Sequence, residues 1–112
     1  MIIKTDDYTI ECTDLNLCKI FGSMRLPSPL SYNQPFSPIK SGIEDATDTY
    51  IIDITELKYL NSSGITSLAR LIIVARKENK ELRLLINNSI PWQKRSLSSL
   101  TALWEKLEIK PV

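Results

Sequence analysis

Residues 50–77 read YIIDITELKYLNSSGITSLARLIIVARK and join a β-branched segment to an amphipathic one. The isoleucines within residues 51–54 are interrupted only by Asp53, which is typical of a central strand covered on both faces. From Ser62 to Lys77 apolar residues recur on one helical face, and basic residues near the end complement the helix dipole. The segment therefore predicts a strand, a brief connector and a helix that opens on two serines and a glycine. A hydroxyl at this point is accessible to a protein kinase, and a helix N-terminus tolerates a phosphate.

The remainder of the chain predicts further strands and helices. Period-two alternation near the N-terminus indicates an antiparallel pair that turns at Thr13-Asp14, and later spacings of three and four indicate helices. Strands that alternate with helices imply right-handed crossovers and locally parallel pairing. We therefore expect one domain, residues 1–112, with a mixed-sheet α/β fold. The predicted strands cover 2–11, 15–22, 51–54, 82–86 and a short segment at 107–109, and the predicted helices cover 34–47, 62–77 and 91–104.

A proline-rich loop at residues 27–38 leads into the first predicted helix. Pro35 can open this helix because its missing donor would be unpaired there, and Pro38 is expected within the first turn. Gly42 is expected to weaken the helix by about 1 kcal/mol. The role of the loop stays open at this point.

Composition excludes several classes of protein. The chain has a net charge of +1, with 43% hydrophobic and 24% charged residues, which is ordinary for a globular domain. This balance gives no reason to expect nucleic acid or an anionic membrane as a partner. No apolar run approaches the length of a bilayer crossing, and the first residues lack the features of a signal peptide. A cytoplasmic location is therefore expected by default.

The cysteines and the missing histidine limit the chemistry. Cys12 and Cys18 are interpreted as small, half-buried strand residues rather than a disulfide, because no export signal precedes them. Two cysteines without histidine cannot supply a structural zinc site. Because the chain contains no histidine, no Ser-His-Asp or Cys-His arrangement can form. We therefore expect no enzymatic activity, no metal and no cofactor.

Two segments carry a resemblance to a known family. Ile51-Ile52-Asp53-Ile54, followed by Leu60-Asn61-Ser62-Ser63-Gly64-Ile65, resembles the STAS domain, whose best-known members are the bacterial anti-sigma-factor antagonists. Leu82-Arg83-Leu84-Leu85-Ile86 is similar to the strand that follows the motif helix in that family. The resemblance covers most of residues 50–109 and, more loosely, the N-terminal hairpin. It implies a STAS-like mixed-sheet fold in a short single-domain bacterial variant.

The resemblance also implies partner switching in signal transduction and transcription regulation, without catalysis by the chain itself. An unphosphorylated antagonist would bind a histidine-kinase-like serine/threonine kinase of the anti-sigma-factor type. That kinase would phosphorylate the serine at the position of Ser62, and a metal-dependent serine phosphatase would remove the phosphate. The phosphate adds about −1.5 to −2 charges. If this charge cost about 3 kcal/mol of binding, the complex would weaken more than a hundredfold.

One residue departs from the family pattern, because the usual aspartate before the acceptor is Asn61 here. Asparagine still caps a helix but has no charge to steer a kinase or polarise a hydroxyl. Phosphorylation would then be slow, depend on another kinase, or be absent. Taken as residue types alone, the motif also fits a capped helix start. Ser63 is the alternative acceptor, with inward capping as its competing role, and Gly64 would allow close approach of the helix.

The predicted helix at 91–104 also begins soon after a strand, with a serine shortly before its first residue. Ser89 is a candidate cap, and Trp92 is either part of the core or an interface anchor. Parallel strands would place both helix starts on one rim of the sheet, where partners of α/β proteins gather. The predicted partner-docking surface around Ser62 consists of Asn61, Ser63, Gly64, Thr66, Ser89 and Trp92.

Two other functions remain open. A constitutive STAS subunit or scaffold would bind a larger complex, such as a transporter ATPase, without phosphorylation, and Asn61 favours this alternative. Binding of a nucleotide or small anion at the Ser62 rim is allowed by the helix ends, although no Gly-rich phosphate loop supports it. The sequence leaves the oligomeric state undetermined.

Overall fold

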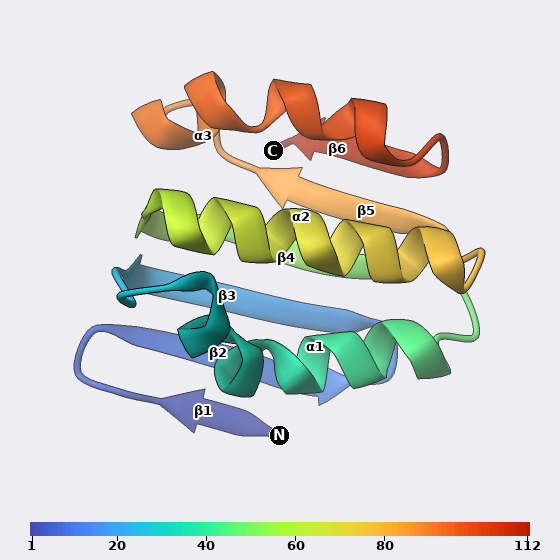
Figure 1. The fold of residues 1–112 in the computed structure, drawn as a ribbon, viewed down its shortest axis with the longest axis horizontal. Coiled ribbons are helices and arrows are strands. Elements are labelled where there is room, and N and C mark those ends of the chain that lie inside the picture. The colour runs from blue at the N-terminus through green and yellow to red at the C-terminus, as the bar shows by residue number, and fades with distance from the viewer.

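The strands form one six-stranded mixed sheet in which their spatial order follows the chain, β1-β2-β3-β4-β5-β6 (Figure 1). The computed structural model describes residues 1–112. Antiparallel pairing joins β1 to β2 and β2 to β3, and parallel pairing joins β3 through β6. The mixed-sheet α/β fold predicted from the sequence is confirmed. The strands are β1 (Ile2–Lys4), β2 (Tyr8–Asp14), β3 (Leu17–Met24), β4 (Tyr50–Leu60), β5 (Leu82–Ile86) and β6 (Leu107–Pro111), and the helices are η1 (Pro29–Tyr32), α1 (Asn33–Asp45), α2 (Ser62–Lys77), α3 (Pro91–Ser96) and η2 (Ser98–Leu103).

The helices cover one face of the sheet, with α1 and α2 side by side across it (Figure 1). Along β4, Ile52 and Ile54 are fully buried beneath the helices, whereas Ile51 and Asp53, which alternate with them, are only half-buried. The prediction that β4 is covered on both faces is therefore wrong. The apolar run suggested burial on both faces. Successive side chains of a strand point to opposite sides of the sheet, so Ile51 faces away from Ile52 and Ile54 although all three are isoleucine.

The N-terminal region contains three strands where two were predicted. The first predicted strand is divided by a turn in which the Thr5 hydroxyl accepts hydrogen bonds from the backbone N–H groups of Asp7 and Tyr8. The following turn lies at Leu15-Asn16 rather than at Thr13-Asp14. The hairpin places Cys12 beside Cys18, with their Cα atoms 4.3 Å apart, and the two form a disulfide. The interpretation of both as free thiols is therefore wrong, because strand register brings them opposite one another.

Helix α1 tolerates a proline and a glycine for specific reasons. Pro38 lies beyond the first turn, later than predicted. The Ser37 hydroxyl donates to the Gln34 carbonyl at 2.9 Å, which replaces the bond that a residue with an N–H at position 38 would make. A Cβ atom on Gly42 would lie 2.6 Å from the Tyr50 hydroxyl oxygen, so glycine here lets the tyrosine ring pack against the helix.

Two other predicted elements change their extent. The strand predicted at 51–54 continues to Leu60, so the expected connector is part of β4. The helix predicted at 91–104 breaks at Leu97 into α3 and the 3-10 helix η2. Serines at 96, 98 and 99 are poor helix formers, which accounts for the break. None of the helices combines the length and apolar character needed to cross a bilayer.

Candidate functional site

The candidate site begins at the start of α2, where β4 ends. Asn61 has extended backbone geometry, and its side-chain oxygen accepts a hydrogen bond from the Gly64 N–H at 3.0 Å. Asn61 is thus the N-cap of the 16-residue helix α2. Ser62 is the first residue within the helix, as predicted.

Asn61 also joins α2 to the proline-rich loop. The Tyr32 hydroxyl donates to the Asn61 Oδ1 atom at 2.6 Å, and the Asn61 Nδ2 atom donates to the Leu26 carbonyl at 2.8 Å. The Leu26 N–H in turn donates to the Tyr32 hydroxyl at 3.3 Å. This closed set of bonds uses an acceptor and a donor on residue 61, which an amide supplies on two separate atoms and an ionised carboxylate does not. Asn61 therefore attaches the proline-rich loop to the start of α2, and the loop is part of the site.

Burial raises the pKa of the Tyr32 phenol, although the hydrogen bond from the Leu26 backbone acts in the opposite direction. The neutral phenol is the form that can donate to Asn61. The raised pKa therefore extends the donating form of Tyr32 further into the alkaline range.

Ser62 presents a free hydroxyl to solvent. Its side chain is exposed and forms no hydrogen bond within the chain, whereas Ser63 is half-buried. Ser63 does not cap the helix, because Asn61 does. Thr66 is exposed one turn after Ser62, on the same side of α2. These positions make Ser62 the more accessible of the two candidate acceptors.

Gly64 is buried beneath the helix start. A Cβ atom at this position would lie 2.3 Å from the Leu60 side chain and 2.8 Å from the Tyr32 hydroxyl oxygen. Glycine thus allows Tyr32 to reach Asn61. Gly64 shapes the site from inside and does not contribute an exposed contact to a docking surface.

Ser67 holds the loop on the next turn of α2. Its hydroxyl lies 3.2 Å from the Pro29 carbonyl and 3.0 Å from the Ser63 carbonyl, and it is almost completely buried. The role of the loop was open from the sequence. Its prolines and serines do not indicate the contacts of Tyr32 and Ser67, because these bonds join residues about 30 to 40 positions apart.

The start of α3 supplies fewer exposed residues for a docking surface than predicted. Trp92 is buried, and its indole N–H donates to the Leu57 carbonyl at 2.9 Å, so it belongs to the core rather than to an exposed docking surface. Ser89 is exposed but does not cap α3, whose N-cap is Ile90. Both α2 and α3 start at the same end of the sheet (Figure 1). Only Ser89 of this pair therefore remains available on that rim.

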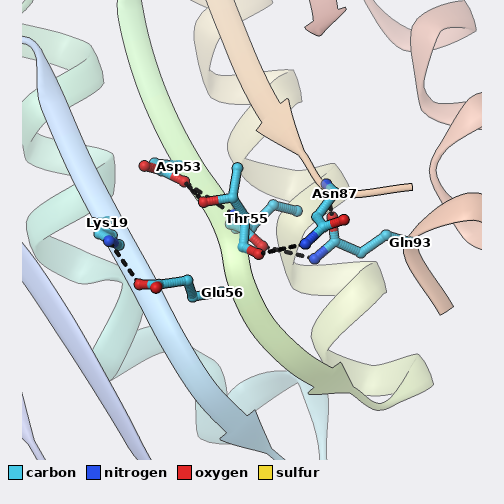
Figure 2. A network of polar contacts seen from close by, with 7 residues as sticks. Lys19, Asp53, Thr55, Glu56, Asn87 and Gln93 are labelled. Carbon is cyan, nitrogen blue, oxygen red and sulfur yellow. Dashed lines mark hydrogen bonds and ion pairs between the residues drawn. The ribbon is translucent and has the colours of Figure 1, made fainter. Parts of the chain in front are cut away.

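Gln93, which was not predicted from the sequence, attaches α3 to the end of β4. β5 pairs with β4 only as far as Asp53, whereas β3 pairs with it as far as Leu60, so beyond Asp53 only the edge of β4 toward β5 lacks a strand partner. Gln93 lies beside Asn87 at β4 (Figure 2), and its Oε1 atom accepts from the Asn87 N–H at 2.8 Å. The buried Gln93 Nε2 atom donates to the carbonyls of Ile54 and Leu57. These side chains complete the hydrogen bonding of β4 and fix its carboxyl end, from which α2 begins.

The polar groups on the uncovered face of the sheet are structural. Lys19 forms an ion pair with Glu56 at 2.7 Å, and this hydrogen bond is the main cause of the raised pKa of Lys19 (Figure 2). The Asp53 carboxylate accepts from both the N–H and the hydroxyl of Thr55. Asp53 and Glu56 thus have separate partners and do not form a pair of catalytic acids.

Three exposed side chains near the Ser62 rim were not predicted. Tyr59 is 38% exposed, and the Arg25 guanidinium stacks 4.4 Å from the centre of its ring. Leu30, in η1 beside the start of α2, is 73% exposed. Aromatic and arginine side chains are enriched at interfaces, and exposed leucine adds apolar contact area. These side chains add aromatic, cationic and apolar surface near the end of β4 and the start of α2.

The fold recurs in a protein of known structure. SiaC, from the crystal structure of diguanylate cyclase SiaD in complex with its activator SiaC from Pseudomonas aeruginosa, matches with a TM-score of 0.73 at 13% sequence identity. The match covers 100% of this chain and 99% of that chain. No protein-family model matches the sequence, and no curated protein does. The two chains therefore share a fold over their whole lengths, and that fold agrees with the STAS-like architecture expected from the sequence.

Proposed function

We propose that this chain is a non-catalytic regulator that acts by binding another protein, and that phosphate on Ser62 controls the binding. The observation that carries the proposal is the position of Ser62. It is exposed, its hydroxyl is free, and it is the first residue of a capped helix. SiaC, which shares the fold, is an activator crystallised with the enzyme that it activates, and this supports a protein partner.

A phosphate fits this helix start. The first amides of a helix and its dipole favour a negative charge, so the modified residue would not unfold α2. Asn61 is uncharged and places no like charge beside the phosphate. The same charge, at the edge of a docking surface, would repel acidic groups of a partner and add a desolvation cost.

For the modification cycle we propose a histidine-kinase-like serine/threonine kinase and a metal-dependent serine phosphatase, as the family resemblance implies. The client released by the switch belongs to signalling: either a sigma-factor system or a signalling enzyme. The complex of SiaC with a diguanylate cyclase supports the second class.

A second candidate is a constitutive binding subunit that is never phosphorylated. The observation that favours it is the hydrogen bonding of Asn61. Both polar atoms of its side chain are committed to internal partners, so the residue beside Ser62 supplies no group to activate the hydroxyl. The docking surface would then work without a switch.

Mass spectrometry of the intact protein from its own cells, with localisation of any phosphate, separates these candidates. A switch predicts phosphate on Ser62 in part of the population under some growth conditions. Its absence under all growth and stress conditions would favour the constitutive subunit.

A binding assay provides the complementary test. The partner is purified after capture on the tagged chain, and its affinity is measured for Ser62→Asp and Ser62→Ala. The switch predicts at least a tenfold loss for Ser62→Asp and an unchanged Kd for Ser62→Ala. Ser99→Asp, which adds the same charge at an exposed position of η2, is the matched control and should bind normally. Equal affinity of both Ser62 variants would contradict the switch.

A further inference from the structure

A groove of about 390 Å³ runs between α1 and α2 on the outer side of the helical layer, where the two helices lie side by side (Figure 1). Each helix contributes positions spaced i, i+3, i+4 and i+7, so the groove follows both helices for about 10 Å. Its lining residues are Tyr32, Asn33, Phe36, Ser37, Lys40, Ser67, Arg70, Leu71 and Val74.

The charges at the groove have one sign. Lys40 on α1 and Arg70 on α2 are both exposed, and no carboxylate is among the lining residues. The two ion pairs of the chain lie elsewhere and involve neither side chain. The groove therefore presents two cations without partners, one from each wall, although the whole chain carries a net charge of only +1.

The floor between these cations is apolar. Phe36 and Leu71 are buried along it, and Val74 is half-buried beside them. An apolar strip flanked by uncompensated positive charge complements a surface with apolar residues and carboxylates. Because the strip extends along two helices, an elongated segment fits it better than a compact molecule. An amphipathic helix laid in a groove between helices is a recurrent mode of peptide recognition.

The groove is continuous with the surface around Ser62. Ser62, Thr66 and Arg70 are exposed at successive i, i+4 positions of α2, so Arg70 belongs both to this row and to the groove. At the end nearer Ser62 the groove is bounded by Tyr32 and Ser67, which bind the helix start described above. A segment lying in the groove would approach the residue that carries the phosphate.

From these features we infer that the α1–α2 groove docks an acidic amphipathic helix of the partner protein. Its apolar side chains lie on Phe36, Leu71 and Val74, and its carboxylates pair with Lys40 and Arg70. The inference rests on the proposed function and names the chemistry of the partner. It also provides a mechanism by which phosphate on Ser62 weakens binding, because a new negative charge on the same helix repels an acidic segment.

The test uses the full chain and a designed probe. The probe is a fluorescent peptide of about 18 residues, long enough to form a helix, with leucines at i, i+3, i+4 and i+7 and glutamates beside them. A twin peptide carries lysine in place of every glutamate. Affinities are measured by fluorescence anisotropy for the unmodified chain, Lys40→Glu/Arg70→Glu and the matched control Lys94→Glu/Arg95→Glu, whose side chains are exposed on α3.

We expect the acidic peptide to bind and the lysine twin to bind at least tenfold more weakly. Lys40→Glu/Arg70→Glu should weaken the acidic peptide about tenfold, and the α3 control less than twofold. In amide NMR spectra the shifts should concentrate at residues 33–40 and 67–74. All four substituted side chains are exposed, and thermal unfolding followed by circular dichroism verifies that the variants remain folded.

Several results would overturn the inference. These are no binding at millimolar peptide, equal binding of both peptides, equal weakening by both double variants, or amide shifts away from the groove. Self-association in sedimentation experiments that disappears in Lys40→Glu/Arg70→Glu would assign the groove to a second copy of the chain instead.

The experiments test the groove inference and the phosphorylation proposal separately. If the acidic peptide binds as expected but Ser62→Asp leaves native partner binding intact, the groove stands and the phosphorylation proposal fails. If Ser62→Asp releases the native partner but the peptide does not bind, the switch stands and the groove inference fails.

Discussion

At the scale of single residues, the site depends on Asn61, which from the sequence alone lacks the charge of the aspartate expected at this position. Asn61 stands where the family that the sequence resembles has an aspartate. Its amide N–H₂ donates to the Leu26 carbonyl, and its oxygen accepts from Tyr32 and Gly64. An aspartate could cap α2 equally well but would face the Leu26 carbonyl with a second acceptor. The residue that weakened the case for phosphorylation is therefore the one that attaches the loop to the helix.

Asn61→Asp should lower the free energy of unfolding by about 1 kcal/mol. Replacing the donor to Leu26 with a carboxylate oxygen costs about 1–3 kcal/mol, and the added negative charge at a helix N-terminus returns about 0.3–1 kcal/mol. Urea denaturation measures the difference. Asn88→Asp, at an exposed position without a side-chain hydrogen bond, is the control and should change stability by less than about 0.5 kcal/mol. Equal stability of Asn61→Asp and the unmodified chain would contradict the role assigned to the amide.

Gly64→Ala should destabilise the protein by about 1–2 kcal/mol even though alanine favours helices by about 1 kcal/mol. The new methyl group would lie within 2.8 Å of both Leu60 and Tyr32, so one of them must move. Thermal unfolding measures the effect, with Ser62→Ala at the exposed neighbouring position as control. A rise in stability for Gly64→Ala would show that the helix start is not as tightly packed as described.

At the scale of elements, β4 extends beyond its neighbour β5 and depends on side chains to complete its hydrogen bonds. Gln93 and Trp92 together satisfy β4 carbonyls that no strand reaches. The short helix α3 is thus attached to the sheet by buried polar contacts as well as by apolar packing. Because α2 starts directly after β4, the position of the Ser62 rim depends on this attachment.

Gln93→Met should cost about 2–4 kcal/mol of stability. The substitution preserves approximate volume but leaves buried backbone groups at Ile54 and Asn87 without their side-chain partner. Chemical denaturation compares it with Gln34→Met, at an exposed position of α1, which should be nearly neutral. A loss below about 0.5 kcal/mol for Gln93→Met would mean that water or another group satisfies the carbonyls.

At the scale of the whole molecule, the two tyrosines under the helices make stability sensitive to alkaline pH. Burial raises the pKa of Tyr50 to about 12 from an ordinary value near 10. Because the folded state holds the neutral phenol, its contribution is complete below pH 10. It is lost as the pH rises from 10 through about 12, where the unfolded chain ionises first.

The unmodified chain should therefore lose more stability between pH 9 and pH 11.5 than Tyr50→Phe does. The difference is bounded at about 2–3 kcal/mol by the size of the pKa shift. The Tyr50 hydroxyl makes no hydrogen bond within the chain, so Tyr50→Phe removes the titrating group without leaving a partner unpaired. Urea denaturation at each pH, with Tyr59→Phe at an exposed ring as control, measures it. Parallel pH profiles for the unmodified chain and Tyr50→Phe would exclude Tyr50 as the cause.

Local patterns in the sequence were sufficient for several parts of this protein. The apolar spacing and basic end of α2 predicted its limits, the compact apolar run at 82–86 predicted β5, and alternation of elements predicted the mixed sheet. The helix start at Ser62 also followed from its neighbours in the chain. The limits of α2 and β5 depend on residues close together in the chain, so local patterns are sufficient to predict them.

Contacts between distant residues decided the rest. Tyr32 meets Asn61 across 29 positions and Gln93 meets Ile54 across 39, and no periodicity records either pair. Whether Trp92 faces a partner or the core, and whether the sheet is covered on one face or two, depends on where the helices pack. The sequence thus determined α2, β5 and the serine at the helix start. Tertiary structure determined the groove, the attached loop and the role of Asn61, because each of these arises only when separate elements share their hydrogen bonds and apolar surfaces.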